Sequence, residues 1–204
     1  GFDNNGRAIL NLNSLLTQRD ISRALTAGGG GFSGYIAAGS AFAAALRTLD
    51  NALLRKPGDP SLLVAQAQVY MQIADFQRAL GLLDTAYGTA STPRDRQTVS
   101  FQHGIASFNL GNYSQAADDF DATLAGRTTF RSKIWPLLWR YAAQIRAKRD
   151  GRAALARDVG AESLNEWPSP IARFLLGKSP AGELEVAAES DEAAKRSNGK
   201  CAAA

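Results

Sequence analysis

The chain has 204 residues, of which 45% are hydrophobic and 21% are charged, and this composition excludes a wholly disordered chain because it supplies enough apolar surface for a core. A single cysteine and a single histidine exclude an intramolecular disulfide and a structural zinc site built from cysteine and histidine ligands. The net charge of +4 comes from one segment, because residues 126–160 carry nine basic and two acidic side chains while the rest of the chain has a small acidic excess.

The N-terminal residues predict a helix followed by a loop. Apolar residues within 1–27 recur at the i, i+3, i+4 spacing of an amphipathic helix, so this segment is predicted to be an N-terminal helix or cap. Residues 28–34 are glycine-rich. Glycines ahead of a helix can cradle a phosphate, but the Gly-Lys-Ser/Thr ending of such loops is missing, so this segment is predicted to be a flexible connection.

A helix-turn-helix pattern is clearest in residues 101–124. Gly104 is a small residue within the first helix, and a break at Gly111 leads into a second helix in which Ala116 and Phe120 are four residues apart. Small residues allow two antiparallel helices to approach closely, and an aromatic side chain fills the space between them. This segment is therefore predicted to form a helical hairpin.

The same pattern recurs upstream. Residues 64–86 predict a first helix, a turn that begins at Ala74, and a second helix in which Ala79 and Leu83 occupy the places of Ala116 and Phe120. Ala45 and Leu49 precede Ala79 and Leu83 by 34 residues. The pattern resembles the tetratricopeptide repeat, a helical hairpin of about 34 residues that stacks on its neighbours. The resemblance covers roughly residues 42–157, and within residues 35–160 it implies an all-α, right-handed α-solenoid of three to four hairpins.

The fourth hairpin departs from the pattern. Its first helix contains Tyr141 and Ala142, its turn contains Asp150, and its second helix has Ala154 at the small position. The place of the bulky side chain is taken by Asp158. The second helix of this hairpin is therefore predicted to be short or turned away.

Two short helices are predicted in residues 161–190. Pro168 or Pro170 can open one that stops at Gly177, and Ser179 with Pro180 can cap and open the next. Residues 191–204 are predicted to be a tail or the start of a further helix. The spacing of the aromatic, apolar and small residues within 167–184 is similar to that in bacterial lipoproteins of the NlpI type. This resemblance implies a periplasmic or membrane-anchored adaptor that holds envelope proteins without being a catalyst.

A repeat solenoid presents a concave face built from its first helices. This face is apolar and amide-rich, with arginines at one end that could pair with a carboxylate of a bound peptide. A second interpretation stays open, in which terminal helices cover these side chains and make them core. By helical spacing the predicted partner-binding residues are Val64, Gln68, Met71, Gln72, Phe101, Gln102, Ile105, Phe108, Asn109, Trp139, Arg140 and Arg146.

No catalytic constellation is found. His103 occupies a helix position that is usually buried. Ser100 and Ser107 lie near it on the same helix, but the sequence offers no oxyanion site and no third catalytic partner, so a core histidine is predicted. The carboxylates at 118, 119 and 121 fan round a helix and indicate a solvated face, and Cys201 is a lone thiol. The prediction is a protein that is not an enzyme and has no cofactor or metal.

The basic segment 126–160 also contains Trp135 and Trp139, a combination that can bind nucleic acid through phosphate contacts and base stacking. The i, i+4 spacing of the two tryptophans favours a packing face instead, so no nucleic-acid binding is predicted. An anionic lipid surface or an acidic protein stays open as a partner of this segment. The predicted function is a protein-binding scaffold or adaptor, and the alternative is a homo-oligomer joined by the C-terminal helices. The predicted location is the cell envelope, and the alternative is the cytoplasm.

Overall fold

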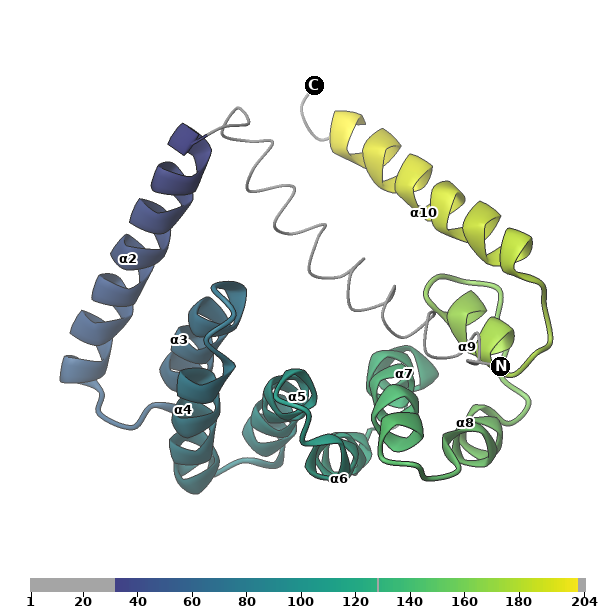
Figure 1. Ribbon diagram of the computed structural model, residues 1–204, viewed down its shortest axis with the longest axis horizontal. Coiled ribbons are helices and arrows are strands. Elements are labelled where there is room, and N and C mark those ends of the chain that lie inside the picture. The colour runs from purple at the N-terminus through teal and green to yellow at the C-terminus, as the bar shows by residue number, and fades with distance from the viewer. Residues whose placement is uncertain (1–31, 128, 202–204) are drawn as a thin grey trace. The chain divides into compact units, whose positions relative to one another are not determined.

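The computed structural model describes residues 32–127 and 129–201, and within these ranges the regular secondary structure is entirely α-helical (Figure 1). The all-α prediction is confirmed. The predicted helix at 1–27 and the glycines at 28–31 lie outside the described residues.

The helices belong to two compact parts that divide between residues 123 and 124, in the last turn of α6. The helices of the first part are α2 (Phe32–Arg55), α3 (Pro60–Gln72), α4 (Phe76–Thr89), α5 (Pro93–Asn109) and α6 (Tyr113–Leu124). Those of the second part are α7 (Phe130–Arg146), α8 (Gly151–Val159), α9 (Ser169–Leu175) and α10 (Ala181–Cys201).

In the first part α2 packs against α3, α3 against α4 and α4 against α5, and α3 also packs against α5. An edge-on contact between the Phe101 and Phe120 rings joins α5 to α6. The hairpins predicted around residues 64–86 and 101–124 correspond to α3–α4 and α5–α6. Contacts between neighbouring helices and between successive first helices are the pattern of a stacked helical repeat. The first part is thus compatible with the predicted repeat fold.

The same kind of capping signal precedes α3 and α5, the first helices of the two hairpins. Asp59 accepts hydrogen bonds from the backbone N–H groups of Ser61 (2.9 Å) and Leu62 (3.2 Å), and Pro60 is the first residue of α3. The same order recurs where Thr92 accepts from the N–H of residue 95 and a proline opens α5. A capping side chain satisfies backbone donors that lack a partner within the helix, and proline is preorganised for the first helical position.

The hairpin turns pass through the left-handed region of backbone space. Ala74, between α3 and α4, has a φ of 61°, and Gly111, between α5 and α6, has a φ of 84°. Asp75 then caps α4 by accepting from the N–H of Arg78 at 3.2 Å. Left-handed backbone ends a helix, so both breaks predicted from the sequence are confirmed.

The core of the first part lies where the repeated positions meet. Ala79, Leu83, Ala116 and Phe120 are each 0% exposed. A Cβ atom on Gly104 would lie 2.8 Å from the Phe120 ring, so the small residue in α5 is what lets the aromatic ring of α6 pack there. The small and bulky positions predicted in these two hairpins are confirmed.

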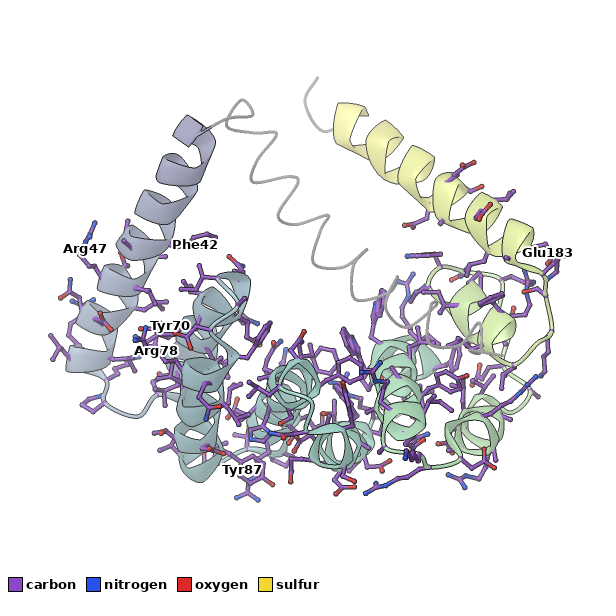
Figure 2. All side chains as sticks on the ribbon, viewed as in Figure 1. Phe42, Arg47, Tyr70, Arg78, Tyr87 and Glu183 are labelled. Carbon is purple, nitrogen blue, oxygen red and sulfur yellow. The ribbon has the colours of Figure 1, made fainter. Side chains whose placement is uncertain are left out.

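An aromatic contact on the surface joins α3 to α4. The Arg78 guanidinium carbon lies 5.7 Å from the centre of the Tyr70 ring. Both side chains are labelled in Figure 2. Such a cation–π contact contributes about 0.5–1 kcal/mol at an exposed site. It adds to the α3–α4 packing outside the core.

In the second part α7 packs against α8 and α9, and α9 packs against α10. α8 is nine residues long, in agreement with the predicted short helix. At the position where the other hairpins bury a bulky side chain, Asp158 of α8 accepts a hydrogen bond from the Arg140 guanidinium of α7. An ion pair thus takes the place of the apolar contact.

Outside the hairpins, two element bounds differ from those predicted. α2 begins at Phe32, so residues 32–34 of the predicted loop are helical, and the alanine-rich sequence that follows favours propagation of the helix. α10 continues to Cys201, well past the predicted boundary at 190. Alanine and glutamate dominate much of its length and no proline interrupts it, so the helix does not stop there.

Within the described ranges, none of the helices is both long enough and apolar enough to cross a membrane.

Candidate functional site

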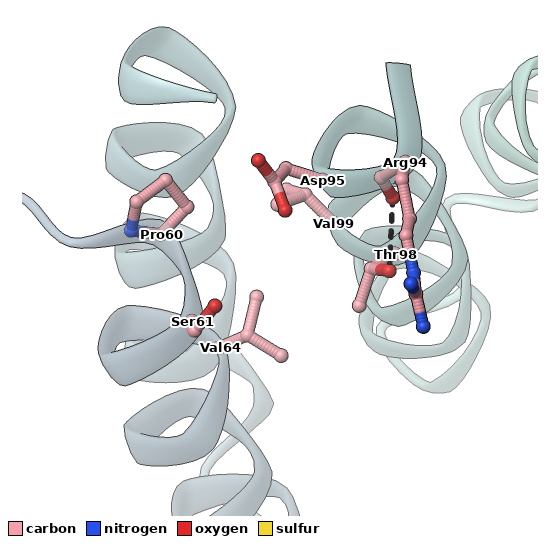
Figure 3. Close-up of a pocket in the computed structure, with 7 residues that line it drawn as sticks. All are labelled: Pro60, Ser61, Val64, Arg94, Asp95, Thr98 and Val99. Carbon is pink, nitrogen blue, oxygen red and sulfur yellow. Dashed lines mark hydrogen bonds between the residues drawn. The ribbon is translucent and has the colours of Figure 1, made fainter. Parts of the chain in front are cut away.

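The first helices of the two hairpins leave a hollow between them. α3 and α5 lie side by side, and the space between their N-terminal halves has a volume of about 360 Å³, comparable with the roughly 300–1,000 Å³ of small-molecule pockets. We call it the α3–α5 hollow. Its lining residues are Pro60, Ser61, Val64, Arg94, Asp95, Thr98 and Val99 (Figure 3).

The hollow combines an apolar floor with a polar edge. Val64 extends from α3 toward α5, and Val99 extends from α5 toward α3 (Figure 3); both side chains are buried. Asp95 points into the same space and accepts a hydrogen bond from the hydroxyl of Thr92 at 2.7 Å. Arg94 is exposed at the edge, where its guanidinium makes no ion pair with another described residue. The site therefore offers apolar contact together with both a hydrogen-bond donor and an acceptor.

Of the partner-binding residues predicted in the first part, Val64 alone lines the α3–α5 hollow. Phe108 is only 6% exposed and its ring packs edge-on against Tyr113 with centroids 5.2 Å apart. This burial favours the core interpretation for Phe108. Gln68 and Gln72 are exposed, and the other predicted residues of this part are half-buried, namely Met71, Phe101, Gln102, Ile105 and Asn109.

The remaining predicted residues belong to α7 in the second part. Trp139 and Arg140 are buried and Arg146 is exposed. The guanidinium of Arg140 is engaged within the fold by Asp158, as described above. Pairing of Arg140 with a peptide carboxylate would have to displace that contact.

Most of the lining residues are absent from the predicted set because the repeat pattern places the starts of the two first helices near Val64 and Phe101, whereas α3 begins at Pro60 and α5 at Pro93. The signals that mark their true starts are the capping residue and proline at 59–60 and again at 92–93. The preference for proline at the first helical position predicts that each of these helices begins a turn or more earlier. Residues 94, 95, 98 and 99 would then have fallen on the first helix.

A charged cluster lies around the only histidine of the chain. His103 of α5 has its Nδ1 atom 2.6 Å from Oδ2 of Asp119 in α6 and its Nε2 atom 3.2 Å from Oδ1 of Asp84 in α4. The Ser107 hydroxyl lies 3.5 Å from the same Nδ1 atom. The half-buried imidazole thus joins three helices of the first part, rather than sitting in an apolar core as predicted.

This arrangement does not form a catalytic triad. In a triad the acid and the nucleophile contact opposite nitrogens of the imidazole, so that the ring can accept the proton of the hydroxyl while the acid orients it. Here Asp119 and Ser107 approach the same nitrogen, and Asp84 takes the other. The geometry fits an imidazolium that donates to two carboxylates.

The pKa of His103 is raised above its ordinary value of 6.5. Burial by itself lowers this pKa, but the hydrogen bond to Asp119 and the negative charges of Asp119 and Asp84 outweigh it. The protonated ring is therefore favoured in the folded chain, where it links α4, α5 and α6.

We expect the stability of the first part to depend on pH through His103. Because the folded pKa is raised, the stabilisation is full below about pH 6.5 and is lost as the pH rises through the raised pKa. Urea midpoints measured between about pH 5.5 and 9 should separate the parent from His103→Gln most at the acidic end, with the gap closing as the pH rises. Parallel curves for the two proteins would contradict this role.

Some arginines of the basic segment 126–160 form hydrogen bonds within the fold. Arg127 donates to the carbonyl of Ser132 at 2.9 Å, and Arg152 donates to the carbonyl of Leu176, at the end of α9, at 2.5 Å. With Arg140 bound to Asp158, three guanidinium groups of this segment make contacts that organise the second part. In the described part of the chain, no group of three or more histidine, cysteine, aspartate and glutamate residues is placed to hold a metal ion.

Comparison with known proteins yields no relative: no protein-family model, no curated protein and no solved structure matches the chain. The all-α fold consequently rests on the helices of this chain alone, and the tetratricopeptide resemblance stays a prediction.

Proposed function

We propose that this chain is a non-catalytic helical-repeat protein of the tetratricopeptide type, whose α3–α5 hollow binds an extended segment of a protein partner. The observation that carries the proposal is the open space of about 360 Å³ between two successive first helices that pack side by side. First helices are the elements on which a repeat protein of this kind presents its concave binding surface.

The lining of the hollow defines the chemistry of the segment. An apolar side chain of the partner packs against Val64 and Val99, and its backbone N–H groups donate to the Asp95 carboxylate. A carboxylate of the partner pairs with Arg94 at the edge, since a guanidinium forms bidentate hydrogen bonds with carboxylates. The preferred segment is therefore extended, with an apolar residue next to an acidic one.

The proposal extends to an adaptor role in the bacterial cell envelope, periplasmic or membrane-anchored. This part is supported only by the sequence resemblance in the C-terminal segment, with a cytoplasmic location as the alternative. Fractionation of the source cells with antibodies against the chain tests it, and recovery with cytoplasmic markers contradicts it.

Filling the hollow should abolish peptide binding. Thr98→Trp places a large ring in the hollow at an exposed position, while Thr85→Trp makes the same change on α4 outside it. The two threonines are matched, because each hydroxyl donates to the carbonyl four residues earlier at 3.0 Å. Decapeptides selected from a displayed random library on the parent protein provide the ligands, and fluorescence anisotropy measures their Kd.

We expect Thr98→Trp to weaken the selected peptides at least about tenfold, which corresponds to roughly 1.4 kcal/mol, and Thr85→Trp to leave Kd within about twofold. Equal binding by both variants would contradict the hollow as the site. If no peptide is selected and light scattering shows a mass that rises with concentration, the homo-oligomer becomes the better interpretation.

A further inference from the structure

A second hollow lies within the second part of the chain. It has a volume of about 530 Å³ and is lined by α7, the α8–α9 connection, the start of α9 and one residue of α10. Phe130, Trp135 and Trp167 contribute aromatic rings to its lining, and all three side chains are half-buried. We call it the aromatic hollow.

Aromatic rings attract cations because the face of the ring carries partial negative charge, and tryptophan does so most strongly. Three aromatic side chains in one lining, two of them tryptophans, are therefore suited to a positively charged group. Half-buried rings also offer apolar contact to the carbon atoms that carry such a group.

The charged residues of the lining favour the same ligand. Three carboxylates, those of Glu162, Glu166 and Asp191, line the hollow against a single basic side chain, Arg131. Neither Glu162 nor Glu166 makes an ion pair with another described residue, although the chain as a whole is basic. An acidic hollow in a basic protein is complementary to a cation and repels an anion.

A serine completes the lining. Ser169, the first residue of α9, is 6% exposed and lines the hollow. Its backbone N–H donates to the carbonyl of Glu166 at 2.8 Å, but its hydroxyl makes no hydrogen bond with another described residue. The hydroxyl oxygen reaches the open space of the hollow, where it can accept a hydrogen bond from an N–H group of a ligand.

We propose that the aromatic hollow binds an organic cation with N–H donors, namely a guanidinium or a primary ammonium group. The aromatic faces contact the cation and its carbon chain, while Glu162, Glu166 and Ser169 accept its hydrogen bonds. An arginine or lysine side chain of a partner and a free polyamine share this chemistry. The site is independent of the α3–α5 hollow, which has different residues and favours an acidic segment.

The test measures cation binding with defined probes. The full chain is titrated with a blocked tripeptide that has arginine between two glycines, with its lysine counterpart, with spermidine, and with the tripeptide in which uncharged citrulline replaces arginine. Tryptophan fluorescence follows binding, since two of the three tryptophans line the hollow, and calorimetry gives Kd. Tighter binding of spermidine than of the tripeptides identifies a free polyamine, and the reverse order identifies a partner side chain.

The decisive variant is the double substitution Glu162→Gln with Glu166→Gln. Its matched control is Glu185→Gln with Glu189→Gln, which removes the same two charges from exposed positions of α10 that do not line the hollow. We expect the first pair to weaken the best cation at least about tenfold, the control to change Kd less than about twofold, and citrulline to bind at least about tenfold more weakly than arginine.

Three results would overturn the proposal. Equal weakening by both pairs would show that only the overall charge matters. Equal binding of the arginine and citrulline tripeptides would show that the cation is not recognised. Absence of a fluorescence or heat change with every cation at millimolar concentration would show that the hollow is not a cation site.

Discussion

Replacement of Ala116 by arginine should unfold the first part of the chain. Ala116 is fully buried in α6, in the same helix face as Phe120, which packs on Gly104 of α5. A long charged side chain cannot fit at such a contact without separating the helices or burying an unpaired charge, at a cost of several kcal/mol. That cost is comparable with the total stability of about 5–15 kcal/mol of a typical domain. Circular dichroism during heating should show a large loss of helix at a much lower temperature than in the parent.

Ala122→Arg is the control, because Ala122 is an exposed alanine of the same helix and the substitution adds the same side chain. A surface substitution of this kind should change the free energy of unfolding by no more than about 0.5 kcal/mol. If Ala116→Arg melted with the control, the assignment of Ala116 to the helix interface would be wrong.

Much of the fold was predictable because it repeats. The pairs at Ala79 and Leu83 and at Ala116 and Phe120 are local patterns, and a repeated local pattern predicts the same packing each time. The breaks at Ala74 and Gly111 were found in the same way, since each interrupts a helical period. The C-terminal boundary was less predictable, because between residues 183 and 198 α10 has no proline or glycine that would interrupt its strong helix formers.

The candidate sites were less predictable because they depend on contacts between helices. His103 meets carboxylates that are 16 and 19 residues away, and helical spacing within one segment contains no information on such pairs. The aromatic hollow gathers residues from α7 to α10 that are neighbours only after folding. In the α3–α5 hollow, by contrast, the missing signal was local, in the capping residues and prolines that open both helices.

The second large effect should come from the ion pair between α7 and α8. Arg140 is 5% exposed and donates a hydrogen bond to Asp158, which also accepts one from Arg157 at 3.1 Å. Burial by itself raises the pKa of Asp158, but the hydrogen bonds from Arg140 and Arg157 and their positive charges outweigh it, so the pKa is lowered. The stabilisation from this carboxylate is therefore present above its usual pKa and is lost as the pH falls through the lowered value.

Asp158→Leu should destabilise the second part by about 3–5 kcal/mol, because it leaves the Arg140 guanidinium buried without this carboxylate. Arg157→Ala, which removes only the exposed partner, should cost at most about 1 kcal/mol. The double variant Arg140→Met with Asp158→Leu converts the position to the apolar contact of the other hairpins, and it should recover most of the loss, as apolar replacements of buried ion pairs do. Urea unfolding of the three variants and the parent measures these changes in the free energy of unfolding. Equal losses for Asp158→Leu and Arg157→Ala would show that the buried pair has no special role, and failure of the double variant to recover stability would show that Arg140 is needed for more than its contact with Asp158.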